Sequence, residues 1–495
     1  MNDLAEKALH GLDATRRRVW SRPLLFFGVL GFVVAGVTVI AGGEIEAARP
    51  TRALTSWLGL QDAHGVQPDN PVPGVIMLAG VAGLVLLWLW AVEYVRRHDP
   101  RESRIWLLAG AWAVPFAVGP PLMGTTVYSY VAFGFLQRRG VSPYDSSASR
   151  LTDQAVVEAI DPGARNTPSS AGPAGTLVQH LAVSISSGSA LGAVIVLRVL
   201  AVLVVVAITR IAADLAGARR ARAITLTALN PLVLLYLVSA ARLDGLMVAL
   251  VLASFIAANQ RKWPTAIMLA ALAGCVLGEA FFVLPALVFV HLLGRRSTVF
   301  WRTLGRDLLI AAATVVVVGV VVADGFGWLW TVHRQFAAHT PFSASSALAK
   351  LLSSIVRGAS YDDLAAGARI TVLTAMLCIV GYFVATARQR ALERTAGYCL
   401  LTLALLAPVL YAWYLLWGLL CLAPTASGPR RIVVLGLFAA GCVLEPPGFA
   451  PTPTHAVTAV ALAVVALATA TSLYLRQRTQ RAAVTAAPAP VSAGS

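Results

Sequence analysis

Long apolar runs recur along this chain and constrain its fold more than any other feature. Residues 23–41, 73–92, 191–209, 307–323 and 456–475 each approach the roughly 20 apolar residues that cross a hydrocarbon core as a helix. In addition, 58% of the residues are hydrophobic and only 13% are charged. That leaves too few charges to solvate the surface of a globular protein. The sequence therefore predicts an all-α polytopic integral membrane protein.

We expect one transmembrane domain over residues 23–475, with about 11–14 helices judged from span length. A basic segment precedes it at 1–22, and the Ala/Pro-rich tail at 476–495 is expected to be disordered. The first apolar run lacks a small-residue cleavage site, so it is expected to remain as the first span. The predicted spans are 23–41, 73–95, 105–122, 187–209, 224–240, 245–258, 264–277, 280–293, 307–323, 370–387, 397–410, 412–424, 432–446 and 456–475.

Basic residues are distributed unequally between the two sides of these spans. The net charge is +16, and 27 of the 39 Lys and Arg residues fall in short loops and tails on one side. Cytoplasmic loops carry such an excess, so both termini are expected in the cytoplasm, with the chain in the plasma membrane. The excess of basic residues then sets the topology and contacts anionic lipid headgroups. Nucleic acid is therefore not expected as a partner.

Three segments on the other side are long, at 42–72, 123–186 and 324–369. Function concentrates on long loops held by a rigid scaffold, so the outer face is where chemistry is expected. Stretches at 176–186, 327–339 and 345–358 have apolar residues at helical spacing, interrupted by polar ones. Each suits a helix lying in the membrane interface. Such a helix would serve either as interfacial packing or as a groove wall for a lipid carrier, and the pattern favours neither.

The stretch at 124–144, GTTVYSYVAFGFLQRRGVSPY, directly follows the third span. Its Tyr-x-Tyr pair, basic pair and Pro-Tyr could build an aromatic-lined mouth near lipid headgroups. It resembles the first-loop motif of the actinobacterial polyprenol-phosphomannose-dependent α-1,6-mannosyltransferases, members of the C-type glycosyltransferase (GT-C) superfamily. That motif reads approximately Asp-x-Tyr-Ser-Tyr, then Gly, then Gly-x-x-Pro-Tyr. The matching residues are Tyr128, Ser129, Tyr130, Gly134, Gly140, Pro143 and Tyr144.

Two later segments resemble the same family, in the family's order. Residues 228–250 are similar to a Leu-Asn-Pro-Leu-Val-Leu segment that is followed by His-Asn-Asp/Glu and then Leu-Met. The matches there are Leu229, Asn230, Pro231, Leu232, Asp244, Leu246 and Met247. Residues 407–424 resemble a late Pro-Trp-Tyr segment through Trp413, Tyr414 and Trp417. Together the three matches extend over nearly the whole chain.

The resemblance implies a GT-C-like bundle that transfers a sugar, expected to be mannose, from a polyprenyl-phosphate donor. The acceptor would be a membrane glycolipid, lipoglycan or glycan of the cell envelope, with other envelope-biosynthesis proteins as possible partners. Outer arginines would meet the donor phosphate, although Arg138 and Arg139 are equally suited to lipid headgroups. The substrate-binding residues expected on this basis are Thr126, Tyr128, Tyr130, Tyr144, Arg138, Arg139, Arg165, Arg242, Trp413 and Tyr414.

Four polar positions depart from the family's pattern. The acidic residue that opens the first motif, taken in the family as the general base, is Thr126 here, and a neutral hydroxyl cannot replace a carboxylate in that role. The His-Asn pair is replaced by Arg242 and Leu243. A basic residue usual in the seventh span is Leu277, and a Pro-Tyr-Gly-Pro signature remains at best as AGPAG at 171–175.

Two explanations for these losses stay open. The base has moved to another carboxylate, for which Asp145, Asp244 and Glu279 are the catalytic candidates, because ionisable groups at membrane depth indicate function. Each has a structural alternative: a turn residue at Asp145, an ion pair with Arg242 at Asp244, and contact with the interface at Glu279. Otherwise catalysis is lost, and the chain binds lipid-linked sugar or a partner transferase without turnover.

Other functional classes are disfavoured by the sequence. A transporter would be expected to show internal repeats with matching broken helices, which we do not find. No cofactor is expected, and no metal site is predicted, because His333 and His339 are six residues apart without a nearby carboxylate. The glycines form no nucleotide-binding motif after a strand, which disfavours a nucleotide-sugar donor.

Overall fold

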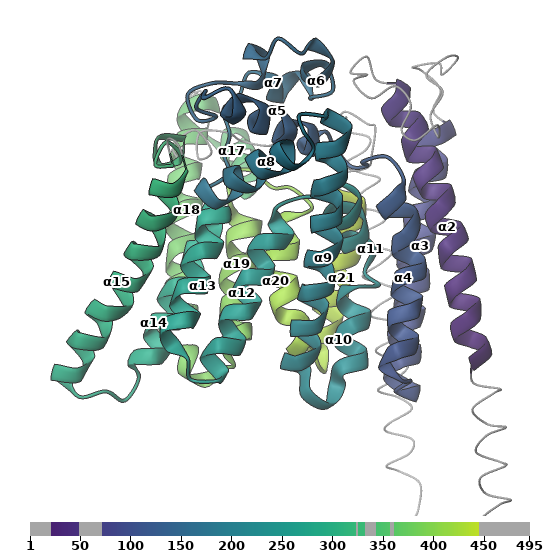
Figure 1. The fold of residues 1–495 in the computed structure, drawn as a ribbon. Coiled ribbons are helices and arrows are strands. Elements are labelled where there is room, and N and C mark those ends of the chain that lie inside the picture. The colour runs from purple at the N-terminus through teal and green to yellow at the C-terminus, as the bar shows by residue number, and fades with distance from the viewer. Residues whose placement is uncertain (1–20, 49–71, 323–324, 332–342, 357–360, 445–495) are drawn as a thin grey trace, which may run out of the picture.

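The computed structural model describes residues 21–48, 72–322, 325–331, 343–356 and 361–444, and this part of the chain is helical without strands. Most of the helices stand side by side as a bundle (Figure 1). They are α2 (Ser21–Ala48), α3 (Val72–His98), α4 (Glu102–Val118), α9 (Ala190–Ala216), α10 (Arg220–Thr227), α12 (Asp244–Asn259), α13 (Trp263–Val276), α14 (Leu284–Leu292), α15 (Ser297–Val321), α18 (Tyr361–Ala385), α19 (Leu392–Leu406), α20 (Tyr414–Leu422) and α21 (Pro429–Leu444).

Five further helices gather over one end of this bundle (Figure 1). We call them the cap layer. They are α5 (Thr126–Arg138), α6 (Gln154–Glu158), α7 (Pro162–Arg165), α8 (Pro173–Ile185) and α17 (Ala344–Ile355). Thus the predicted outer segment 123–186 consists largely of helices. The predicted amphipathic stretches at 176–186 and 345–358 correspond to α8 and α17, whereas 332–339 and most of 42–72 lie outside the described residues.

The prediction of an all-α polytopic membrane protein is confirmed. Among the described residues, five helices are long and apolar enough to cross a membrane, or six if one bent pair counts as a span. Every predicted span except 456–475, which lies outside the described residues, coincides with helical chain. The prediction for 307–323 began too late, because α15 extends ten residues further toward its N-terminus, through Arg302 and Arg306.

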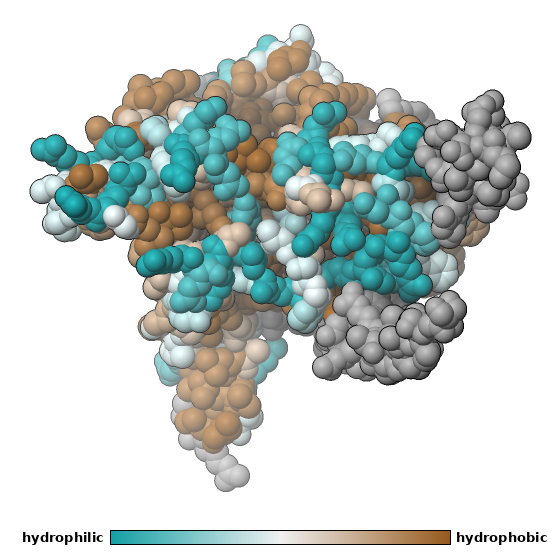
Figure 2. All heavy atoms as spheres, turned by 90° about the horizontal axis from the view of Figure 1, so that it is seen from below, coloured by the Kyte–Doolittle hydropathy of each residue, from teal (hydrophilic) through white to brown (hydrophobic). Residues whose placement is uncertain are grey.

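The opposite end of the bundle is rich in basic side chains, and we call it the basic end. Seen from below, hydrophilic residues spread across much of this face (Figure 2). The helices there are joined by short connections that contain exposed basic residues, namely Arg97, Arg101, Arg219, Arg261, Lys262, Arg295, Arg296, Arg302, Arg388 and Arg430. The helical bundle therefore separates a cap layer from a cationic surface.

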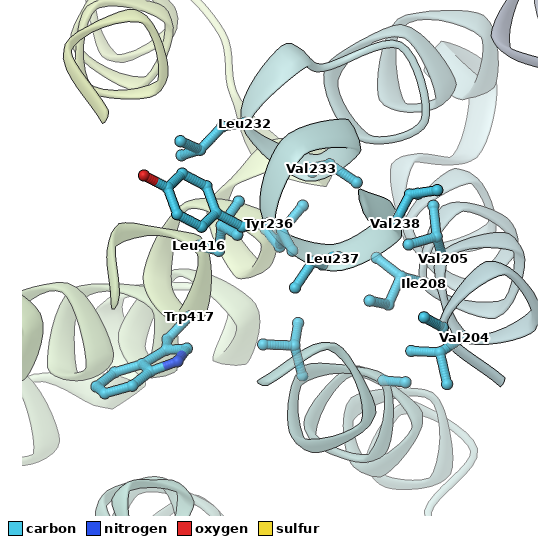
Figure 3. Packing of buried hydrophobic residues seen from close by; sticks show 14 of the residues in the cluster. Val204, Val205, Ile208, Leu232, Val233, Tyr236, Leu237, Val238, Leu416 and Trp417 are labelled. Atoms are coloured by element: carbon cyan, nitrogen blue, oxygen red, sulfur yellow. The ribbon is translucent and has the colours of Figure 1, made fainter. Parts of the chain in front are cut away.

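Close packing of branched apolar side chains fills the centre of the bundle. Side chains of α9 face the irregular helix η4 (Leu234–Ser239), and α20 contributes residues from the other side (Figure 3). The labelled members of this core are all buried, as expected for interiors packed to crystal-like density. They are Val204, Val205, Ile208, Leu232, Val233, Tyr236, Leu237, Val238, Leu416 and Trp417.

The Leu-Asn-Pro segment interrupts one span at mid-depth. The Asn230 side chain accepts a hydrogen bond from Leu232 N at 2.9 Å, and Pro231 begins the short helix α11 (Pro231–Val233). These are an N-cap and a first-turn proline, both of which start a new helix. The chain then continues as the π-helix η4 and bends by 114° into α12. Ala241, in that bend, has a left-handed φ of 48°.

Candidate functional site

The bend between η4 and α12 presents two charged side chains together. Arg242 Nε donates to Asp244 Oδ2 at 3.0 Å, and Arg242 Nη1 donates to Thr126 Oγ1 at 2.9 Å. Asp244 is the first residue of α12 and is 2% exposed, while Thr126 is the first residue of α5. The guanidinium therefore links the transmembrane bundle to the cap layer.

An aromatic wall from α20 completes the surroundings of this ion pair. The Trp413 ring lies under the Arg242 guanidinium, with Cζ 3.6 Å from the ring centroid. Trp417 Nε1 donates to Asp244 Oδ1 at 2.8 Å, and Tyr414 stacks on Trp417 at 4.1 Å. Arginine stacks on aromatic rings while its fork binds oxygens in plane, so this arrangement fixes the guanidinium in one orientation.

One polar group of the aromatic wall has no acceptor. Trp413 Nε1 is buried and makes no hydrogen bond to any residue that the structure describes. Buried N–H groups are nearly always hydrogen-bonded, so an exception calls for a specific explanation. Beside Arg242, such a donor is suited to an oxygen of a bound ligand.

Glu279 lies close to the same ion pair, although it comes from a different part of the chain. It belongs to the 3-10 helix η5 (Gly278–Val283), which follows an extended residue, Leu277. Glu279 is within electrostatic range of both Asp244 and Tyr414. It is half-buried, and no basic side chain among the described residues pairs with it. It is therefore available as a carboxylate near Asp244.

The remnant AGPAG segment positions this part of the site. Gly172 N donates to Val276 O at 3.0 Å. Val276 is followed by the extended residue Leu277, after which the chain continues to Glu279. A Cβ at Gly172 would lie 2.3 Å from Cys275 O, so only glycine allows this approach. The close contact joins the start of α8 to the end of α13.

Tyr130 approaches the bend from the cap layer. It is 8% exposed and lies within electrostatic range of Arg242 and Asp244. Burial raises the pKa of the Tyr130 hydroxyl to about 12, so the hydroxyl stays protonated near neutral pH. It can then serve as a neutral hydrogen-bond donor at the site.

The remaining predicted residues lie away from this cluster. Arg138 and Arg139 are exposed at the far end of α5, roughly 18 Å from its start at 1.5 Å per residue. Arg139 Nη1 donates to Thr152 Oγ1 at 3.0 Å. Asp145 is exposed, and Arg165 Nε donates to the Ile160 carbonyl within its own loop at 2.9 Å.

Two predicted tyrosines have structural surroundings. Tyr144 is 2% exposed, and its hydroxyl lies 3.2 Å from Thr176 Oγ1 of α8. The ring leaves no room for a side chain at Gly327, where a Cβ would approach it to 2.6 Å. Tyr128 is half-buried and lies within electrostatic range of Arg198. The structure thus gathers Thr126, Tyr130, Arg242, Asp244, Glu279, Trp413 and Tyr414 from the predicted set.

Two residues that help to build the site, Trp417 and Arg198, were not among the predicted site residues. Trp417 was noted as a motif match, and its position one helical turn after Trp413 was the available signal for a shared face. Arg198, on α9, donates from Nη1 to Phe116 O at 2.6 Å and to Gly119 O at 3.0 Å. It thereby binds the carbonyls that end α4, just before the segment that leads to Thr126. A single basic residue within an apolar run was the signal there.

The fold and this cluster define a polytopic membrane protein with a polar site under a helical cap. The alpha-(1->6)-mannopyranosyltransferase N-terminal domain family matches residues 25–293, and the MptB C-terminal domain family matches residues 343–472. The chain therefore belongs to the alpha-(1->6)-mannopyranosyltransferase family, which confirms the resemblance found in its motifs.

Two individual relatives are similar in sequence to this chain over most of their length. The chain is 26% identical to alpha-(1->6)-mannopyranosyltransferase A of Mycobacterium tuberculosis over 424 residues, which cover 82% of this chain and 81% of the relative. It is 25% identical to alpha-(1->6)-mannopyranosyltransferase B of Corynebacterium glutamicum over 469 residues, covering 86% and 76% respectively. Similarity of this extent is not confined to one segment of the fold.

Proposed function

We propose that this chain transfers a mannosyl group from a polyprenyl-phosphate donor to a glycolipid or glycan of the cell envelope. The transfer would occur at the cap-layer end, which we assign to the outer face of the plasma membrane, with both termini in the cytoplasm. The observation that carries the proposal is the Arg242 guanidinium, fixed by Asp244, Thr126 and Trp413 at the junction of bundle and cap.

Arg242 is suited to the donor phosphate. As the bond between the sugar's anomeric carbon and the phosphate oxygen breaks, negative charge grows on the leaving polyprenyl phosphate. A guanidinium that is already oriented stabilises that charge without reorganising. The buried Trp413 N–H beside it offers one further donor to the same oxygens or to a sugar hydroxyl.

Glu279 is the best placed of the three candidate carboxylates to act as the base. Each oxygen of Asp244 already accepts a hydrogen bond, from Arg242 and from Trp417. Asp145 is exposed and lies outside the gathered cluster. Glu279 would accept the proton of the acceptor hydroxyl as its oxygen forms the new bond to the anomeric carbon, while Asp244 holds Arg242 in position.

The test measures transfer by the full chain in nanodiscs, supplied with polyprenyl-phosphate mannose and envelope lipid. Loss of a general base lowers turnover by about 10²–10⁴-fold, which we expect for Glu279→Gln. Asp145→Asn is the matched control, because it removes a carboxylate from the same side of the bundle outside the cluster. Equal turnover in Glu279→Gln and wild type would exclude Glu279 as the base.

A second candidate function is a binder of lipid-linked sugar that does not turn over. Thr126 favours it, because the family's expected acidic residue is missing there while the neighbouring Tyr128 and Tyr130 are kept. The same experiment separates the two functions. Binding of the donor by wild type without any transfer to envelope lipid would support the binder, and measurable transfer would exclude it.

A further inference from the structure

A cavity of about 180 Å³ opens at the basic end, on the opposite side of the bundle from Arg242. It lies between α19 and α21, with the end of α20 behind it. Each helix contributes one stripe at helical spacing: Arg394, Tyr398 and Leu401 on α19, and Arg430, Val433, Val434 and Leu437 on α21. The cavity is therefore a groove between two helices, whose walls are set by their i, i+3, i+4 and i+7 positions.

Polarity changes along this groove. Arg394 and Arg430 lie near the first turns of α19 and α21, where these helices leave the basic end. Further along, the walls are formed by Leu401 and Leu437, with Leu422 at the back. A ligand that fits would have an anionic group at the membrane surface and an apolar chain directed into the bilayer.

Among the residues that the structure describes, neither Arg394 nor Arg430 pairs with a carboxylate, and no carboxylate lines the groove. Arg394 Nε is buried without a hydrogen-bond acceptor. The adjacent carboxylate of Glu393 accepts from Asn259 Nδ2 at 3.2 Å and so is directed to a different contact. Two cations in an apolar setting are thus left for a ligand to neutralise.

We infer that this groove binds an anionic glycerophospholipid of the adjacent leaflet. Its phosphate would lie between Arg394 and Arg430, and one acyl chain would follow Leu401 and Leu437. Basic pockets between helices at a membrane surface bind anionic headgroups in this way, and arginine matches phosphate oxygens with two parallel donors. The Tyr398 ring is held in place by stacking on Phe383, with ring centroids 5.1 Å apart, so this wall is preformed.

The experiment titrates delipidated full-length protein in neutral detergent with phosphatidylglycerol, and native mass spectrometry counts bound lipid. Two arginine–phosphate contacts predict an affinity about 30-fold weaker in Arg394→Gln/Arg430→Gln than in wild type. The single change Arg430→Gln, at an exposed position, should weaken binding about 5-fold and keeps the test valid if the double variant misfolds.

The matched control is Arg219→Gln/Arg302→Gln, which removes the same charge from exposed positions of the basic end outside the groove. It should bind phosphatidylglycerol as wild type does. Further arms supply phosphatidylcholine, to test the headgroup, and inorganic phosphate, to test the need for an acyl chain; both should bind far more weakly. Equal affinity in the groove and control variants, or equal binding of phosphatidylcholine or inorganic phosphate by wild type, would overturn the inference.

Discussion

Arg242 donates a hydrogen bond to Thr126 at the position where the family's motif has an acidic residue. The distance between Nη1 and Oγ1 is 2.9 Å, and Nε of the same guanidinium binds Asp244 at 3.0 Å. Two of the departures from the family pattern are therefore in direct contact. In this chain the contact between Arg242 and Thr126 links α5 to the bend.

This contact makes the effect of Thr126→Asp depend on residue 242. Introduced alone, the carboxylate would accept from Arg242 and compete with the donor phosphate, so we expect turnover to fall. Arg242→His alone should also lower turnover, because the bonds to Thr126 and Asp244 are lost. The double variant should recover part of the loss. A cycle of kcat/KM values measures the coupling, which for contacting residues is about 0.5–3 kcal/mol. Strictly additive effects would contradict the pairing.

Arg242→Lys should lower kcat/KM by about 10- to 100-fold, although the charge is conserved. An ammonium group cannot bind Asp244 and Thr126 in the same plane while stacking on Trp413. Steady-state kinetics with varied donor concentration would show a raised KM for the donor. Arg139→Lys, at an exposed position of α5, is the control and should behave as wild type. Comparable loss in both variants would argue against a particular role for Arg242.

Trp417→Phe should destabilise the protein and also reduce its activity. The change removes the N–H that binds Asp244 Oδ1 and leaves a buried carboxylate oxygen unsatisfied, at a cost of about 2–3 kcal/mol in the free energy of unfolding. Trp88→Phe is a matched control, because Trp88 Nε1 binds the neutral carbonyl of Thr225 at 2.9 Å far from the site. It should cost about 1 kcal/mol and leave the activity per folded molecule unchanged.

The assigned orientation predicts which surfaces an impermeant maleimide can reach in intact cells. In a Cys378→Ser background the four remaining native cysteines are buried. Labelling by the maleimide then reports only on the cysteine that has been added. Ser149→Cys and Ser353→Cys, both on the cap-layer side and exposed, should be labelled from outside. Ala218→Cys, exposed at the basic end, should be labelled only after lysis. The reverse pattern would place the cap layer in the cytoplasm.

The sequence located the apolar helical segments because hydrophobic length is a local property, although only five of the described helices, or six with the bent pair, are long and apolar enough to cross a membrane. It placed the start of α15 too late, since charged residues at a membrane surface interrupt an apolar run without ending the helix. Arg302 and Arg306 are the charged residues that lie within α15 before the predicted start. A contact between helices supports this region, since Oδ2 of the buried Asp307 lies 2.6 Å from His291 Nδ1 of α14. A tertiary partner of this kind leaves no trace in a hydropathy pattern.

The site could be predicted only in part for the same reason. Motif matches found Asp244 and Trp413, and Arg242 was noted as a departure from the motif. The motifs could not show that Glu279, 35 residues after Asp244, approaches Asp244 through the irregular helix η5. The exposed Arg138 and Arg139 matched the chemistry of phosphate binding equally well. They belong to the same motif stretch as Thr126 in the sequence, whereas the length of α5, which has 13 residues, separates them from Thr126 in space.

The bend between η4 and α12 makes the site sensitive to chain length rather than to composition. Each residue of an α-helix advances the side-chain direction by about 100°. Inserting or deleting one residue between Ser239 and Asp244 would therefore turn the Asp244 carboxylate away from Trp417 or shift all of α12 within the bundle. A change of length would dismantle the entire constellation at once. Insertions and deletions are consequently excluded from the four residues between Ser239 and Asp244, one of which is Arg242.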